Sequence, residues 1–181
     1  MLRNPLRYHF IQAPLLLLLV LLTACAEPPK KTFEIYDGPM AVIENVNLTY
    51  SDSARLTMRL QAKVQRELKN KDRVFPKGML LTYYDEKGEV INTLRADSTY
   101  HVNLANIWFA FGNVQLKNIE KKEILLTEEL IWKPIEKNVE TDKFVRIESP
   151  GQVLTGKGLR AKDDFSDYEV LEPEIIYNTS K

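Results

Sequence analysis

Few side chains in this sequence are of the types that catalyse reactions. The chain has one cysteine, Cys25, and two histidines, His9 and His101. Zinc sites collect several Cys or His ligands, and nucleophilic catalysis pairs a Ser or Cys with a base. A lone His101 between polar neighbours fits an ordinary strand residue. The sequence therefore predicts no metal site, no cofactor and no enzyme.

The remaining candidates for chemistry are acidic pairs and one glycine pair. Glu128-Glu129, Asp163-Asp164 and Asp52 supply carboxylates, but glycoside hydrolysis needs two of them facing one cleft, one with a raised pKa. Adjacent side chains on a strand point to opposite faces, so we interpret them as solvated charge. Gly156-Lys157-Gly158 lacks the third glycine and the strand-to-helix setting of a dinucleotide loop, which favours a turn or kink.

Cys25 is the side chain with a specific chemical prediction. Arg3 and Arg7 precede an apolar run, Leu15 to Leu22, and then Leu22-Thr23-Ala24-Cys25. A spanning helix needs roughly 20 apolar residues, so the run fits a secretory signal. The pattern resembles a bacterial lipoprotein signal, in which residues 1–24 are removed and the Cys25 thiol is lipidated. The alternative is an ordinary secreted protein with an incidental cysteine.

The rest of the chain is the right size for one domain. Residues 25–39 contain Pro28-Pro29 among polar residues and are predicted to form a flexible tether, followed by a domain over residues 40–178. Removal of Arg3 and Arg7 leaves 23 basic against 25 acidic side chains, a net charge of −2. This balance argues against a nucleic-acid partner, and we expect membrane attachment through the lipid anchor.

Alternation of apolar and polar residues indicates strands. Leu56 to Val64 alternates without a break, which predicts a strand with one dry face carrying Leu56, Met58, Leu60, Ala62 and Val64. Further predicted strands are 78–84, 89–96, 98–104, 107–111, 114–118, 123–132, 139–147, 153–155, 158–161, 168–171 and 174–177. Many short strands separated by turn signals predict an antiparallel all-β sandwich, barrel or roll.

A weak internal repeat suggests how the strands are arranged. Segments that open at Tyr100 and Trp132 are followed by similar strands, with an offset of 31 to 32 residues. Each unit would be a strand, a turn and a return strand. Repeated hairpins favour a stacked β structure over a round sandwich.

An ordered set of short motifs resembles the LptC family of lipopolysaccharide-export components. Its pieces are Leu126 to Trp132, Val139 to Ile147 and Leu154 to Ala161, with a related first unit at Leu94 to Tyr100 and Gly112 to Val114. The resemblance covers residues 40–177. It implies a twisted, open β-jellyroll that takes the acyl chains of lipopolysaccharide into an apolar groove.

The resemblance also implies partners. Lipopolysaccharide would arrive from an LptB/LptF/LptG-type ABC transporter and leave to an LptA-like bridge protein. The transporter contact is expected on the first strands, from Ala41 to Tyr50, and the bridge contact at the C-terminal edge, from Glu169 to Tyr177. The residues chosen for these edges are Val42, Val46, Leu48, Val170 and Ile175.

Alternation selects the residues expected to touch lipid in that groove. They are Met58, Leu60, Leu81, Tyr83, Phe109, Phe111, Leu130, Trp132 and Val145. We expect Leu60→Asp to block lipid passage, with a risk of misfolding. The alternative is an envelope lipoprotein scaffold whose β domain binds proteins only, and this predicts a filled core with no room for tails.

The N-terminus departs from the pattern of familiar LptC proteins, which are held by a transmembrane helix. A lipoprotein signal would keep the domain in the periplasm on a tether instead. Ala26 follows Cys25, and a non-Asp residue there usually sorts a lipoprotein to the outer membrane. The role implied by the resemblance requires the inner membrane, which we favour.

Overall fold

A computed structural model describes residues 36–178, with side chains described through residue 174. The chain divides into Met1–Asp37 and Gly38–Lys181, and the described strands all belong to the second unit. The predicted signal peptide, Cys25 and most of the predicted tether lie outside the described residues.

The described part of the chain is all β and contains no helix. Its eleven strands are β1 (Ala41–Asp52), β2 (Arg55–Glu67), β3 (Arg73–Phe75), β4 (Met79–Tyr84), β5 (Val90–Ala96), β6 (Ser98–Val102), β7 (Ile107–Asn118), β8 (Glu123–Lys133), β9 (Asn138–Ser149), β10 (Gln152–Lys162) and β11 (Tyr168–Asn178). They form one antiparallel sheet, which confirms the predicted jellyroll-like all-β class.

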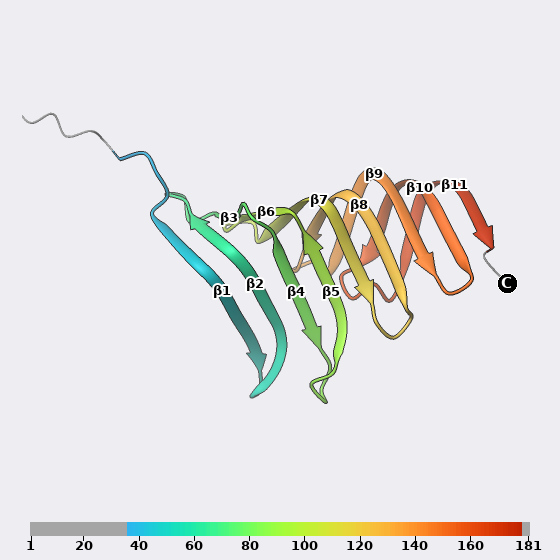
Figure 1. Cartoon of the computed structure of the whole chain (residues 1–181), viewed down its shortest axis with the longest axis horizontal. Coiled ribbons are helices and arrows are strands. Elements are labelled where there is room, and N and C mark those ends of the chain that lie inside the picture. Colours follow the sequence, from blue (N-terminus) through green and yellow to red (C-terminus); the bar gives the residue numbers. More distant parts are fainter. Residues whose placement is uncertain (1–35, 179–181) are drawn as a thin grey trace, which may run out of the picture. The chain divides into compact units, whose positions relative to one another are not determined.

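Most strands of the sheet pair with their neighbours in sequence, and the exceptions are β3 with β4 and β5 with β6. Strands β7 to β11 follow one another in chain order across it (Figure 1). Strands β3 and β4 both pair with β2, while β5 and β6 both pair with β7. Strands β3 and β4 together therefore behave as one long strand that is interrupted near Gly78. Strands β5 and β6 likewise behave as one long strand that is interrupted at Asp97.

Irregularities at similar positions in successive strands bend the sheet into two layers. Register shifts occur between Phe111 and Val114, between Thr127 and Ile131, and between Lys157 and Leu159. Bulges of this kind bend a strand and change its twist. We call this row of irregular positions the crease. Gly112 sits in it with a φ of 72°, a left-handed conformation that glycine adopts without strain.

Contacts across the interior show that the two layers face each other. The rings of Tyr83 on β4 and Trp132 on β8 meet edge to face with centroids 6.3 Å apart, although β5 and β7 separate these strands in the sheet. Fully buried side chains fill the space between the layers, the largest being Phe75, Phe165, Leu60, Leu81, Leu116, Leu125, Leu130, Ile147 and Leu159. The fold is thus a creased sheet closed on an apolar core.

The long alternating segment behaves as predicted. Strand β2 runs from Arg55 to Glu67, with Leu60 and Val64 buried and Met58 half-buried on its inner side. The predicted units that open at Tyr100 and at Trp132 correspond to the hairpins β6–β7 and β8–β9, each a strand, a turn and a return strand.

Several predicted strand ends are wrong. Breaks were expected at Gly112-Asn113, at Gly156 to Gly158 and before Glu174, but β7, β10 and β11 run through these positions. A glycine in a strand can accommodate a bulge without ending the strand, and this is what happens at the crease. The short β3 was not predicted, because its three residues show no alternation that sequence patterns could detect.

Candidate functional site

An opening between the two layers is the best candidate for a functional site. This hollow, here called the mouth pocket, has a volume of about 360 Å³. It is lined by Tyr50, Thr57, Met58, Arg73, Tyr83, Asn106, Trp108, Trp132 and Pro134. Strands β2 and β4 supply residues from one layer, while β3, β7 and β8 supply residues from the other.

Aromatic rings build the inner wall of the mouth pocket. Trp108 and Trp132 occupy paired positions on β7 and β8, with ring centroids 5.7 Å apart. Phe75 stacks behind Trp108 at 5.9 Å. The indole Nε1 of Trp132 is buried and has no hydrogen-bond acceptor among the described residues. The wall therefore combines a large apolar surface with a buried N–H group that has no acceptor. Buried donors are rarely left without a hydrogen bond.

A polar network holds one cation at the rim of this wall. The guanidinium of Arg73 donates from Nε and Nη2 to Nδ1 of His101, over 3.2 and 3.0 Å. Its Cζ lies 5.3 Å from the centroid of the Trp108 ring, within reach of a cation–π interaction. The imidazole stacks on the same ring at 4.1 Å. Arg73 is thus fixed from two sides.

The hydrogen bonds of His101 define its tautomer. Because Nδ1 accepts from Arg73, the ring hydrogen is on Nε2, which donates to Asn106 Oδ1 over 3.1 Å. Burial lowers the pKa of His101 below its ordinary value. The imidazole is therefore neutral, with both nitrogens engaged. His101 is a strand residue, as expected, but it is buried and supports Arg73.

The carboxylate next to Arg73 in sequence is already engaged elsewhere. Asp72 accepts hydrogen bonds from the Tyr100 hydroxyl, from Asn70 Nδ2 and from the backbone N–H of Asn103. These bonds, the Tyr100 one first, lower the pKa of the Asp72 carboxyl. Arg73 forms no ion pair with any carboxylate among the described residues. The rim of the mouth pocket thus carries an unpaired cation.

A short segment closes the interior at the C-terminal half of the domain. Residues 163–167 connect β10 to β11, and Phe165 inserts its fully buried ring into the core and stacks on Tyr168. Asn92 Nδ2 donates to the Asp164 carbonyl over 2.8 Å, and Lys121 Nζ donates to the Ser166 carbonyl over 2.6 Å. We call this segment the strap, because it joins the free ends of the two layers.

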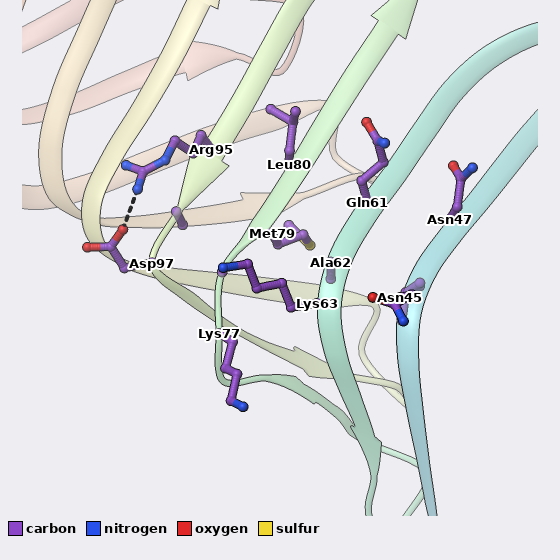
Figure 2. A pocket seen from close by; sticks show the side chains of 13 residues that line it. Asn45, Asn47, Gln61, Ala62, Lys63, Lys77, Met79, Leu80, Arg95 and Asp97 are labelled. Atoms are coloured by element: carbon purple, nitrogen blue, oxygen red, sulfur yellow. Dashed lines mark hydrogen bonds and ion pairs between the residues drawn. The ribbon is translucent and has the colours of Figure 1, made fainter.

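Two further hollows lie on the outer side of the sheet. The larger, about 590 Å³, follows the crease between β1 and β5. Figure 2 shows Lys63 reaching from β2 toward the start of β4, with Lys77 nearby and Arg95 paired to Asp97 at 2.7 Å. The other, about 440 Å³, is lined by residues of β7 to β11. Both hollows mix charged and apolar side chains, and neither is lined by a tryptophan.

The predicted groove residues fall into three groups. Met58, Tyr83 and Trp132 line the mouth pocket. Leu60, Leu81, Leu130 and Val145 are inward but fully packed in the core, with at most 1 % of each exposed. The structure thus brings three of the nine residues together at the mouth pocket and packs four in the core. One of these four, Leu130, also lines the 440 Å³ hollow together with Phe109 and Phe111.

The inward orientation expected for Phe109 and Phe111 is wrong. They pair across the β7–β8 ladder with Ile131 and Glu129, so they share the outer face of the sheet, and Phe111 is 38 % exposed. Every residue from Ile107 to Phe111 is apolar, so alternation did not distinguish the two faces. On this strand it is Trp108 that faces the interior and lines the mouth pocket, and sequence patterns selected neither it nor Arg73.

The edge residues are exposed to different degrees. On β1, Val42 and Leu48 are 53 % and 37 % exposed, whereas Val46 is buried against the core. On β11, Val170 packs partly against the core, and the side chain of Ile175 lies outside the described side chains. Strand β1 pairs only with β2 and β11 only with β10, so each leaves one edge unpaired within the described residues.

Two searches of residues 36–178 gave negative results. No group of three or more His, Cys, Asp or Glu side chains there is placed to hold a metal ion. Within the same range, no helix is long and apolar enough to cross a membrane.

The fold and the mouth pocket together define a class: an antiparallel β-jellyroll with an opening between its two layers. The family described as "Lipopolysaccharide-assembly, LptC-related" matches residues 15–172. This match spans most of the sequence, and the chain belongs to that family. No curated protein matches the chain. Family membership gives it a role in lipopolysaccharide transport in the cell envelope, within a family of transport components rather than enzymes.

Proposed function

We propose that this protein receives lipopolysaccharide from an LptB/LptF/LptG-type ABC transporter and passes it to an LptA-like bridge protein. The acyl chains enter between the two layers while the sugars stay outside. The observation that carries the proposal is the mouth pocket, an aromatic-walled opening into an otherwise packed interior. Each methylene moved from water to this wall contributes roughly 0.8 kcal/mol, so binding needs no catalysis.

The size of the mouth pocket limits what it holds in the closed domain. At about 360 Å³, it lies near the lower end of the roughly 300–1,000 Å³ range of small-ligand pockets. A lipid with several acyl chains therefore requires the layers to part. Direction and energy would come from ATP hydrolysis in the transporter.

The unpaired sheet edges support the proposed partners. An exposed strand edge can take an added strand from another protein through main-chain hydrogen bonds. In this proposal β1, with Val42 and Leu48 exposed, contacts the transporter. Strand β11, with Val170 and Ile175, contacts the bridge protein. Both contacts rest on the family, since the strand edges alone do not identify a partner.

Attachment is proposed to occur through lipidated Cys25 on the periplasmic side of the inner membrane. Two or more acyl chains hold a protein stably on a membrane, whereas one holds it weakly. A tether over residues 25–39 would leave the β domain free to reach both partners.

In-cell photo-crosslinking from Met58 tests the proposal. Met58 lines the mouth pocket. Its neighbour Arg59 does not, and its guanidinium lies over the ring of Tyr84, so position 59 serves as the matched control. We expect an ATP-dependent lipopolysaccharide adduct from position 58 and none from position 59. A folded, anchored protein that gives no adduct at position 58 would favour the alternative, a scaffold that binds proteins only.

The buried position of Leu60 changes how the groove is best probed. Its side chain is fully buried in the core, and an unpaired carboxylate there would cost several kcal/mol. Leu60→Asp is therefore expected to unfold the domain, and it would not report on lipid passage. Met58→Asp places the charge in the half-exposed mouth, where the domain can tolerate it.

A further inference from the structure

The mouth pocket contains polar groups that a site for plain hydrocarbon would not need. Arg73 is half-buried at its rim, and no carboxylate among the described residues pairs with it. A guanidinium held partly away from water without a counter-charge is unfavourable unless another anion approaches it. The wall beneath this cation is formed by Trp108 and Trp132.

The cation is positioned in advance of any ligand. His101 Nδ1 accepts from both Nε and Nη2 of Arg73, and the Trp108 ring supports the guanidinium at 5.3 Å. Fixing a long side chain in one geometry reduces the entropy lost when it binds a partner. The remaining N–H groups of the guanidinium suit the oxygens of a phosphate or carboxylate.

We propose that the mouth pocket binds an anionic amphiphile, with its charged headgroup at Arg73 and its apolar chain against Trp108 and Trp132. This inference rests on the proposed function and names the part of the lipid that the domain would recognise. The unsatisfied Nε1 of Trp132 is a second donor, available to an ester or hydroxyl oxygen near the start of the chain once the wall rearranges around it.

The binding assay uses the full-length protein in phosphatidylcholine vesicles. The chain has only two tryptophans, Trp108 and Trp132, so its intrinsic indole fluorescence reports on this wall alone. Octyl phosphate, 1-octanol and inorganic phosphate are titrated separately. These probes distinguish a charged head joined to a chain, the chain with a neutral head, and free phosphate.

We expect octyl phosphate to bind about tenfold more tightly than octanol, because one charge-assisted contact is of that size. Inorganic phosphate should leave the fluorescence unchanged at the same concentrations, because it cannot use the wall. Equal affinity for octyl phosphate and octanol would overturn the proposal. So would a response to inorganic phosphate as strong as that to octyl phosphate.

Variants locate the effect at Arg73. Arg73→Gln should remove the preference for octyl phosphate, and Arg73→Lys should keep most of it. Arg59→Gln is the matched control, since Arg59 is also a half-buried arginine over an aromatic ring but does not line the mouth pocket; it should keep the full preference. A preference that persists in folded Arg73→Gln would contradict the proposal.

A measurement on the unmodified protein covers the case in which Arg73→Gln does not fold. Added salt screens charge interactions, so the preference for octyl phosphate should shrink as ionic strength rises, while octanol binding should not weaken. A salt-independent preference would overturn the role of Arg73. If the protein shows no preference for octyl phosphate but the Met58 adduct forms, lipopolysaccharide transport is supported and the headgroup site is not. If the preference is present but no adduct forms, the protein has a site for an anionic lipid and the proposed transport function fails.

Discussion

At the scale of single residues, the mouth pocket depends on one neutral histidine. His101 has Arg73, Asp72, Asn106 and Trp108 around it. Its Nδ1 lone pair accepts from Arg73, and protonation there would replace that hydrogen bond with repulsion between two cations. The geometry of the rim is therefore linked to the protonation state of this side chain.

This linkage predicts a pH-dependent stability. The pKa of His101 is lower in the folded domain than its ordinary value of 6.5, chiefly through burial. The folded state therefore binds the proton less well than the unfolded state. The free energy of unfolding should be unaffected by this group above about pH 6.5 and should fall as the pH drops below it.

Chemical denaturation at pH 7.5 and pH 5.5 measures the effect, with His101→Gln as the comparison. Gln can accept from Arg73 without titrating, so the variant should lose less stability than the natural protein between the two pH values. Equal losses of stability in both proteins would show that the pKa of His101 does not differ between the folded and unfolded states.

The backbone position of Gly156 allows a second prediction at this scale. A Cβ there would lie 2.5 Å from the Glu172 carbonyl oxygen and 2.9 Å from the Pro173 Cα. Because backbone atoms cannot move aside independently, Gly156→Ala should push β11 away from β10 and cost about 1–3 kcal/mol. Amide hydrogen exchange should show lost protection along β11.

Gly151→Ala is the matched control for that substitution. Gly151 has a φ of 79° but open space around its Cβ position, so alanine there incurs only backbone strain and should leave β11 protected. Retained protection of β11 in Gly156→Ala would contradict this prediction, because it would mean that β10 and β11 stay paired with the extra methyl group between them.

Residue patterns predicted faces only where they were unambiguous. In Leu56 to Val64 the polar residues alternate strictly, and Leu60 and Val64 are buried as expected. In the all-apolar segment before Gly112, two faces were equally possible, and Phe109 was assigned to the wrong one. Arg73 was missed because an isolated arginine carries no sign of its surroundings until the fold places it beside Trp108.

At the scale of elements, the strap contributes more to the stability of the domain than its short length suggests. Phe165 lies 0 % exposed within the core, and Asn92 and Lys121 bind the strap from the opposite layer. Asn92 and Asp164 are 72 positions apart in sequence. No local pattern predicts such a contact, so sequence reasoning assigned the region only to solvated charge.

Phe165→Ala should therefore be strongly destabilising. Removal of a fully buried phenylalanine ring costs about 3–5 kcal/mol, since a cavity replaces its contacts. Phe144→Ala is the control, because Phe144 is 53 % exposed on the outer face and should change the stability by much less. Urea denaturation of the two variants measures both values, and similar midpoints would contradict the role assigned to the strap.

At the scale of the whole molecule, the described β domain and the predicted anchor are separate parts. The fold class could be predicted from the alternation of apolar and polar residues and from turn signals. The way in which the two layers face each other depends on packing between residues far apart in sequence. Cys25 lies outside the described residues, and its lipidation remains a prediction of the Leu22-Thr23-Ala24-Cys25 motif.

Metabolic labelling with radioactive palmitate tests the anchor. The natural protein should incorporate label, and Cys25→Ser should incorporate none, because no other cysteine is present. An ordinary secreted protein would be unlabelled in both forms, and label in Cys25→Ser would place the modification on another residue.

The crease has a further consequence for how this architecture can change in size. Because β7, β8 and β9 each cross both layers, the width of the interior is set by strand length and its extent by strand number. Inserting one more hairpin of this kind would lengthen the interior by about 10 Å, at 4.7–4.9 Å for each strand. Duplication of a hairpin therefore offers a simple route to a longer or shorter passage with unchanged walls.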